Sequence, residues 1–283
     1  MKIYNTDVIN GLSKISDESI DVIIADPPYN IGKDFGNNET QLEIQEYSEW
    51  ANEWIKESIR VLRPTGTFYI YGISENLAYL LPLIPIKKRW LVWHYTNKNS
   101  PTNPFWQRSH ESIICAGKEN QIFNKDDIRE PYTEVFLKNA AGKKRKGTEG
   151  RFSKDGKTTI YNAHKNGALP RDVIKIPALA GGAGRVERFF YCKQCDDIYK
   201  LNKRPEHQDH DIVIHPTQKP SELSLKLLKA AKPKENCVAA VLFTGTGSEL
   251  YAAQSLNMRC FGFEINEDYI KMANILLEKG YPQ

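Results

Sequence analysis

Four residues directly after a predicted buried strand could bind an amino group. The strand covers residues 20–25 and reads IDVIIA, and the residues that follow it are Asp26, Pro27, Pro28 and Tyr29. Ligands of open α/β sheets bind beyond the carboxyl ends of the strands. The prolines fix φ and carry no N–H, which holds their neighbours rigidly. We expect Asp26 and the Pro27 carbonyl to accept the N–H groups of an exocyclic amine, with Tyr29 stacking on its ring. The alternative is a plain Asp-Pro-Pro turn.

A glycine turn joins a second strand to a helix. Residues 243–248 read FTGTGS, without the Gly-Lys-Ser of a phosphate loop and without the third glycine of a dinucleotide fingerprint. Glu264 ends the next strand, 17 residues after Gly247. A carboxylate at that place can accept both ribose hydroxyls. The pair indicates an adenosine-bearing cofactor without a pyrophosphate, unless Glu264 is only a solvated strand end.

A third segment, residues 215–220, reads HPTQKP. With this segment, the sequence resembles amino-directed DNA methyltransferases that use S-adenosylmethionine. The order of the segments, with DPPY first, HPTQKP next and the glycine turn last, is that of the circularly permuted β group. The resemblance covers about residues 1–120 and 215–280. It implies a Rossmann-like α/β methyltransferase sheet with an inserted target-recognition lobe.

The resemblance also assigns roles to single residues. The segment from Asp26 to Tyr29 would hold and stack a flipped base. Thr217 and Lys219 would lie near the methionine carboxylate of the donor, and Asp7 would meet its adenine amine, unless Asp7 only forms a local turn. The full set expected to bind the donor is Asp7, Thr217, Lys219, Phe243, Gly245, Gly247, Ser248 and Glu264.

One position departs from the family pattern. The family's glycine turn usually begins Asp-Pro-Phe, but Val241 and Leu242 precede Phe243 here. The usual Asp can pair with the donor's ammonium group and a valine cannot. Either another carboxylate or carbonyl supplies this contact, or donor binding is weakened, which leaves a noncatalytic DNA-binding relative as an alternative.

The first motif position bears on which amine is methylated. Asp26, rather than a serine, resembles the adenine-N6 enzymes more than the cytosine-N4 enzymes, which remain an alternative. Cytosine-C5 chemistry needs a cysteine nucleophile in a Pro-Cys context, and no cysteine of this chain follows a proline. A methyltransferase that acts on RNA or on a protein amide would share the donor site. The Asp-first motif and the basic insert favour DNA, by resemblance.

Two cysteines and two histidines could close a tetrahedral zinc site. They are arranged as Cys192-x-x-Cys195 and His207-x-x-His210. The histidine gap of two residues is shorter than the usual three to five. Residues 189–192 also resemble an ordinary segment of related methyltransferases that bind no metal. The sequence prediction is therefore no metal, with zinc as the alternative.

Basic side chains gather in the middle of the chain. Between residues 138 and 175 there are eleven Lys and Arg against three Asp and Glu. Clustered cations bind phosphates by displacing counterions, although a solvated loop can have the same composition. The residues expected to contact DNA are Arg108, Lys143, Lys144, Arg145 and Lys146.

The pattern of apolar residues predicts the elements that carry these motifs. Strands are expected at 20–25, 67–71, 90–93, 112–116, 238–243 and 259–264, and helices at 46–62, 248–256, 267–278 and from Ser221, which would cap its helix. We expect one sheet built from both ends of the chain. Residues 1–120 and 215–283 would form the methyltransferase domain, and 121–214 the basic target-recognition region.

Composition limits the class of protein. The chain has 283 residues and a net charge of +4, and its longest apolar stretch has ten residues and is broken by two prolines. This excludes a membrane span of about 20 residues, and the first residues show no secretory signal. An odd count of five cysteines favours a reducing compartment. We expect a cytoplasmic enzyme that acts on double-stranded DNA, with a homodimer and a cognate restriction endonuclease as further expected partners.

Overall fold

The computed structural model describes residues 1–32, 41–97, 105–146, 158–180 and 187–282. It divides the chain into two compact units. The larger unit combines residues 1–123 with 172–283, and the smaller unit covers 124–171. No helix among the described residues is both long and apolar enough to span a bilayer.

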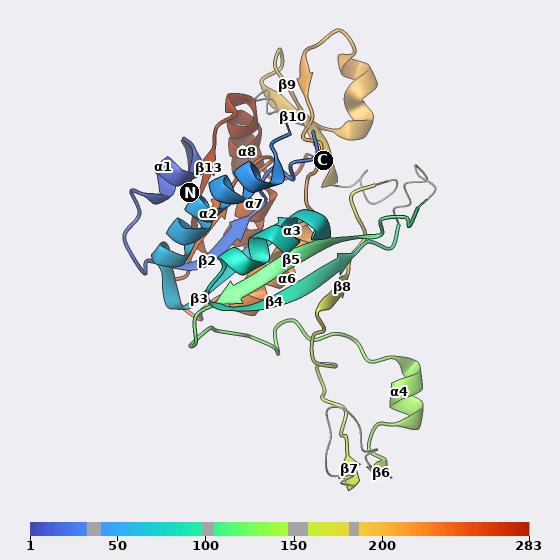
Figure 1. Cartoon of the computed structure of the whole chain (residues 1–283). Helices are drawn as coiled ribbons and strands as arrows, with labels where there is room; N and C mark the ends of the chain where they lie inside the picture. Colours follow the sequence, from blue (N-terminus) through green and yellow to red (C-terminus); the bar gives the residue numbers. More distant parts are fainter. Residues whose placement is uncertain (33–40, 98–104, 147–157, 181–186, 283) are drawn as a thin grey trace. The chain divides into compact units, whose positions relative to one another are not determined.

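A mixed eight-stranded sheet forms the centre of the larger unit (Figure 1). Its order is β1 (Lys2–Asn5), β13 (Arg259–Glu264), β12 (Val238–Leu242), β2 (Ile20–Ala25), β3 (Leu62–Gly72), β5 (His110–Gly117), β4 (Lys87–His94) and β8 (Val173–Lys175). The strands from β1 to β3 are parallel, whereas β5 runs antiparallel to both β3 and β4. The prediction of one sheet built from both ends of the chain is therefore confirmed.

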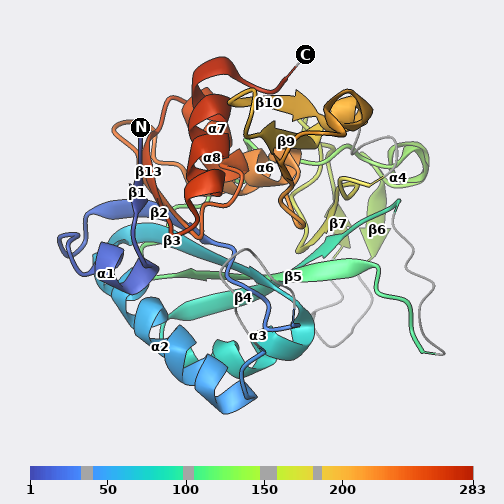
Figure 2. The same ribbon diagram turned by 90° about the horizontal axis from the view of Figure 1, so that it is seen from above.

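Helices cover both faces of this sheet (Figure 2). One face carries α1 (Val8–Leu12), α2 (Ile44–Val61) and α3 (Ser74–Leu80), and the other carries α6 (Ser221–Ala231), α7 (Ser248–Ser255) and α8 (Glu267–Lys279). Every residue of β2 is buried because alternate side chains enter opposite layers. Val22 and Ile24 pack into the layer of α6 and α7, whereas Ile23 and Ala25 pack into the layer of α2.

A smaller sheet packs against α8 in the same unit. Its strand order is β10 (Asp197–Lys200), β9 (Phe189–Cys192) and β11 (Ile212–Val213), and a 3-10 helix over Leu201–His207 connects β10 toward β11. Phe189 and Tyr191 share an apolar cluster with Met272 and Leu276 of α8. This cluster fixes β9 to the methyltransferase sheet's helical layer.

The smaller unit, residues 124–171, contains α4 (Glu134–Asn139) and a hairpin of β6 (Lys144–Lys146) and β7 (Thr158–Ile160). Tyr132 stacks on Phe136, with ring centroids 4.7 Å apart. This unit is shorter than the predicted region 121–214. The difference arises because β8 pairs with β4 at the edge of the large sheet and β9 packs on α8.

Most predicted elements match the structure to within a few residues, and β13 has the predicted bounds. The predicted cap at Ser221 is wrong. Pro220 occupies the N-cap position of α6, and its side chain makes no capping hydrogen bond. Instead, the backbone N–H of Ser221 donates to the Glu187 carboxylate at 2.9 Å. A carboxylate from another segment thus satisfies an N–H that a capping side chain would have bound.

Candidate active site

The carboxyl ends of β2 and β12 lie side by side. The two strands pair in parallel, and the Asp26 N–H donates to the Leu242 carbonyl at 3.4 Å. The DPPY segment and the glycine turn therefore emerge next to each other at one edge of the sheet, where ligands of α/β proteins bind. A cavity is lined by both segments together with parts of residues 215–219 and 263–266. Among the predicted residues, those that line it are Asp7, Asp26, Pro27, Pro28, Tyr29, Thr217, Lys219, Phe243, Gly245 and Glu264.

A buried ion pair holds Asp26. Lys219 Nζ donates to Asp26 Oδ2 at 2.6 Å, and the lysine side chain is only 3% exposed. Burial alone would lower the pKa of Lys219, but Asp26 and Glu111 raise it above its usual value. Lys219 therefore stays charged, and its positive charge favours the ionised, accepting form of Asp26. In this structure Lys219 binds Asp26, so its predicted place near the donor's carboxylate stays a prediction.

Tyr29 is held from several sides. Its hydroxyl lies 3.0 Å from both Asp26 Oδ1 and Glu111 Oε2, and Asn76 donates to its carbonyl. Burial, followed by the charges of Asp26 and Glu111, keeps the pKa of Tyr29 well above its usual range. The phenol thus remains a donor. Sequence reasoning missed Glu111 because β5 brings it to the site from 82 positions away, and no local pattern marks that pairing.

The glycine turn has a backbone that side chains would disturb. Gly245 has φ +51°, and a Cβ there would lie 2.8 Å from His215 Nε2. Its N–H donates to Glu264 Oε2 at 2.8 Å, and Glu264 Oε1 accepts the N–H of Asn266 at 2.9 Å. These bonds orient the Glu264 carboxylate at the edge of the cavity. Phe243 also has a positive φ of 62°.

Two of the predicted donor residues lie behind the cavity. Gly247, with φ +81°, begins α7, and a Cβ there would lie 2.8 Å from the Ala273 side chain. Ser248 is fully buried and its hydroxyl lies 2.8 Å from that of Thr246. Both residues therefore shape the turn from within the fold. Thr246, which the sequence prediction omitted, lines the cavity.

Asp7 has a structural role and also lines the cavity. Its Oδ1 accepts the N–H groups of Ile9 at 2.9 Å and Asn10 at 3.2 Å, which caps α1. The cap occupies one carboxylate oxygen, and a carboxylate can accept about four hydrogen bonds in all. The local-turn alternative and the cavity position are thus compatible.

Val241 is buried in the apolar layer with Leu223 and does not line the cavity. Another carboxylate does. Glu249, in the first turn of α7, lines the cavity and is 5% exposed, and its Oε1 has no hydrogen-bond partner among the described residues. Burial, together with the charge of Asp26, raises the pKa of Glu249 to about 7. The sequence did not single out Glu249, because a Glu in a helical first turn is ordinary.

A family model for N6- and N4-directed methyltransferases, described as DNA methylase, matches residues 20–275. The chain belongs to this family of DNA methylases. The methylase is 29% identical over 276 residues to the DNA adenine methyltransferase YhdJ of Escherichia coli (strain K12), which covers 95% of this chain and 80% of YhdJ.

Solved structures share the fold of this methylase. The cytosine-N4-specific PvuII DNA methyltransferase superposes with a TM-score of 0.63 at 14% identity, covering 96% of this chain and 84% of that one. A DNA modification methylase of Thermus thermophilus complexed with S-adenosyl-L-methionine gives a TM-score of 0.56 at 15% identity, covering 99% and 94%. The methylase therefore has a Rossmann-like methyltransferase fold.

The residues predicted to contact DNA are distributed over both units of the methylase. Arg108 forms two bonds to Glu75, of 3.1 and 2.7 Å, on the surface of the larger unit. Lys143 is exposed and donates to the Lys138 carbonyl at 2.9 Å, and Lys144 and Lys146 are exposed on β6 of the smaller unit. The side chain of Arg145 lies outside the described part of the chain.

Glu249 provides a test of the cavity's electrostatics without any ligand. A carboxyl whose folded pKa is raised binds more protons when folded, so its contribution to stability falls as pH rises from its unfolded value toward about 7. We expect Glu249→Gln to gain in unfolding free energy over the wild type, and this gain to be about 2 kcal/mol larger at pH 8 than at pH 5. Urea unfolding of both proteins at the two pH values measures it.

The matched control is Glu119→Gln, which changes an exposed carboxylate. Its difference from the wild type should be the same at both pH values. An equal pH response in the two variants would show that Glu249 is ionised in the folded protein as readily as a surface glutamate.

Proposed function

We propose that the chain is a DNA methyltransferase that transfers a methyl group from S-adenosylmethionine to the N6 amine of a flipped adenine. The observation that carries this proposal is the shared cavity, in which Asp26 and Tyr29 lie beside the glycine turn and Glu264. Acceptors for an amine and a cradle for a nucleoside thus open into one space. The family, whose members are DNA methylases, supports DNA as the substrate.

The lining residues fit S-adenosylmethionine. Gly245 leaves free the space that a Cβ would fill, and Glu264 carries an oriented carboxylate suited to ribose hydroxyls. Asp7 would meet the adenine amine of the donor. The unpaired Oε1 of Glu249 supplies the carboxylate that Val241 cannot, and it would take the donor's ammonium group. When bound, the donor offers an electrophilic methyl group on its sulfonium.

The residues around Asp26 would orient the amine. Asp26 and the Pro27 carbonyl would each accept one N–H, which directs the nitrogen lone pair toward the methyl group. Tyr29 would stack on the base, as flipped bases are held between aromatic and apolar groups. Lys219 keeps Asp26 in its accepting form. Positioning supplies most of the catalysis, since the proton can leave after the amine has attacked.

Two observations bear on the choice of base. Asp26 stands first in the motif, as in adenine-N6 enzymes, and the relative YhdJ is named an adenine methyltransferase. The similarity to the cytosine-N4-specific PvuII enzyme concerns the fold alone. Cytosine N4 is the second candidate, because the same acceptors would hold its amine. A noncatalytic relative is disfavoured by the complete set of bonds around Asp26 and Tyr29.

Replacing Asp26 should separate methyl transfer from donor binding. We expect Asp26→Asn to lower methyl transfer to DNA by at least about a hundred-fold, because orientation of the amine is lost. Affinity for S-adenosylmethionine should change by less than about three-fold, since the glycine turn and Glu264 are untouched. Tritium transfer and calorimetric titration measure the two effects.

The asparagine variant keeps the shape of the side chain, so Lys219 remains partly paired and the fold is preserved. Asp17→Asn, which changes an exposed carboxylate, is the control and should match the wild type in both assays. Normal turnover by Asp26→Asn would remove Asp26 from the proposed role.

We propose that the basic residues of the smaller unit bind DNA phosphates. Replacing Lys143, Lys144, Arg145 and Lys146 together by Gln should weaken DNA binding. It should also reduce the slope of log affinity against log salt by up to about 3, because fewer counterions are released. Fluorescence anisotropy at several salt concentrations measures this slope.

The control replaces two exposed lysines of the larger unit, Lys14 and Lys56, by Gln. A slope that changes equally in the two variants would show that the phosphate contacts lie elsewhere.

A further inference from the structure

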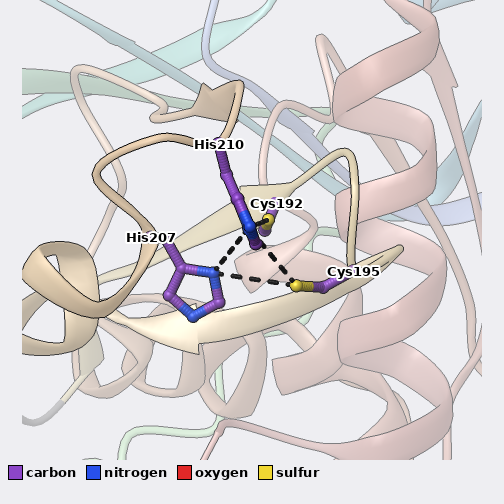
Figure 3. A group of neighbouring side chains, drawn as sticks. All are labelled: Cys192, Cys195, His207 and His210. Carbon is purple, nitrogen blue, oxygen red and sulfur yellow. Dashed lines mark hydrogen bonds between the residues drawn. The ribbon is translucent and has the colours of Figure 1, made fainter.

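Four side chains with metal-binding atoms gather on the small sheet β10–β9–β11. They are Cys192, Cys195, His207 and His210, and one ligand atom from each lies within 4.8 Å of all the others. Figure 3 shows the two sulfurs and the two imidazoles pointing toward a common centre. None of them lines the methyltransferase cavity. The function proposed above therefore leaves this cluster unexplained.

The separations match a tetrahedron. Bonds of 2.3 Å to sulfur and 2.0–2.1 Å to nitrogen give ligand separations of about 3.3 Å between nitrogens and about 3.5 Å between nitrogen and sulfur. The two histidine Nδ1 atoms lie 3.3 Å apart. Cys195 Sγ lies 3.7 Å from His207 Nδ1 and 3.6 Å from His210 Nδ1, and Cys192 Sγ lies 3.2 Å from His210 Nδ1.

The short histidine gap is explained by the local backbone. The His210 N–H donates to the His207 carbonyl at 3.0 Å, which closes a tight turn. This turn brings both rings to the same side, where each presents Nδ1, the ring nitrogen closer to the backbone. The usual gap of three to five residues suits other placements of the two imidazoles. The spacing that argued against a metal in the sequence is thus accommodated by this turn.

The surroundings hold the ligands in place. Cys192 ends β9 and is buried, and Cys195 lies in the turn to β10, whose Asp196 has φ +49°. The His207 ring is 8% exposed and packs on Tyr199, with centroids 4.3 Å apart. Gln194 Oε1 accepts the Asp211 N–H at 2.9 Å, which ties the cysteine turn to the segment just after His210.

The chemistry of the donors selects the ion. Two thiolates and two imidazoles in a tetrahedron are typical of Zn²⁺. All four positions are filled by protein atoms, as in structural sites, whereas catalytic zinc keeps one position open. Two thiolates also balance the charge of the ion. We propose that Cys192, Cys195, His207 and His210 bind one structural zinc ion, in place of the sequence prediction of no metal.

The ion would fasten a polar segment to the core. Residues 201–211 are mostly exposed and bury few apolar side chains. The segment is followed by β11 and then by residues 215–219, which carry Lys219 into the cavity. The Lys193 ammonium contacts Asp268 of α8 at 2.8 Å beside the cysteine turn. Zinc would therefore stabilise the approach to the methyltransferase site without contributing to methyl transfer.

The test is metal content and spectroscopy of the full chain. We expect tag-free protein, purified without chelator, to contain about one zinc per chain by mass spectrometry. Titration of the thiols with a mercurial should release this zinc. Protein produced with Co²⁺ should show the visible absorption bands of a tetrahedral cobalt–thiolate site.

Cys195→Ser should reduce the zinc content to below about a tenth and abolish the cobalt bands. Cys115→Ser, which changes a cysteine remote from the cluster, should keep both. Mercurial release from the wild type needs no variant, so the proposal stays testable if Cys195→Ser fails to fold. Wild-type protein with far less than one zinc per chain, and without cobalt bands after addition of Co²⁺, would overturn the proposal.

Discussion

The ion pair between Lys219 and Asp26 is the interaction on which the site depends. The two residues are 193 positions apart, and both side chains are largely removed from solvent. A buried charge that loses its partner costs about 3–5 kcal/mol, so each residue constrains the position of the other. Because Asp26 follows β2 and Lys219 precedes α6, the pair also joins the two ends of the chain at the cavity. Tyr29 and Glu111 extend the same network.

Parallel pairing of β2 with β12 makes this arrangement possible. Both strands are buried on both faces, and their register sets Ala25 opposite Leu242. A shift of one residue would turn each side chain to the opposite layer, and it would also separate Asp26 from the glycine turn. The site is therefore specified by the packing of the two apolar layers as much as by its own polar residues.

The sequence predicted the strands and the motifs that follow them, because strand ends and glycine turns leave local patterns. Glu111 and Glu249 could not be found in this way. Glu111 reaches Tyr29 through the antiparallel pairing of β5 with β3, and no local signal encodes that neighbour. Glu249 looks like an ordinary first-turn glutamate until burial shows an unpaired oxygen beside the cavity. The tight turn between His207 and His210 was equally hidden in the spacing.

The central claim is that Asp26 and its neighbours present an exocyclic amine of DNA to a methyl donor. Modified-base sequencing tests it most directly, on DNA from cells that express the intact chain and from cells that express Asp26→Ala. The account predicts N6-methyladenine within a short motif, present only with the intact chain. N4-methylcytosine in its place would keep the amine-directed mechanism and correct the base. DNA without modified bases, or with the same modification in both cell lines, would contradict the account.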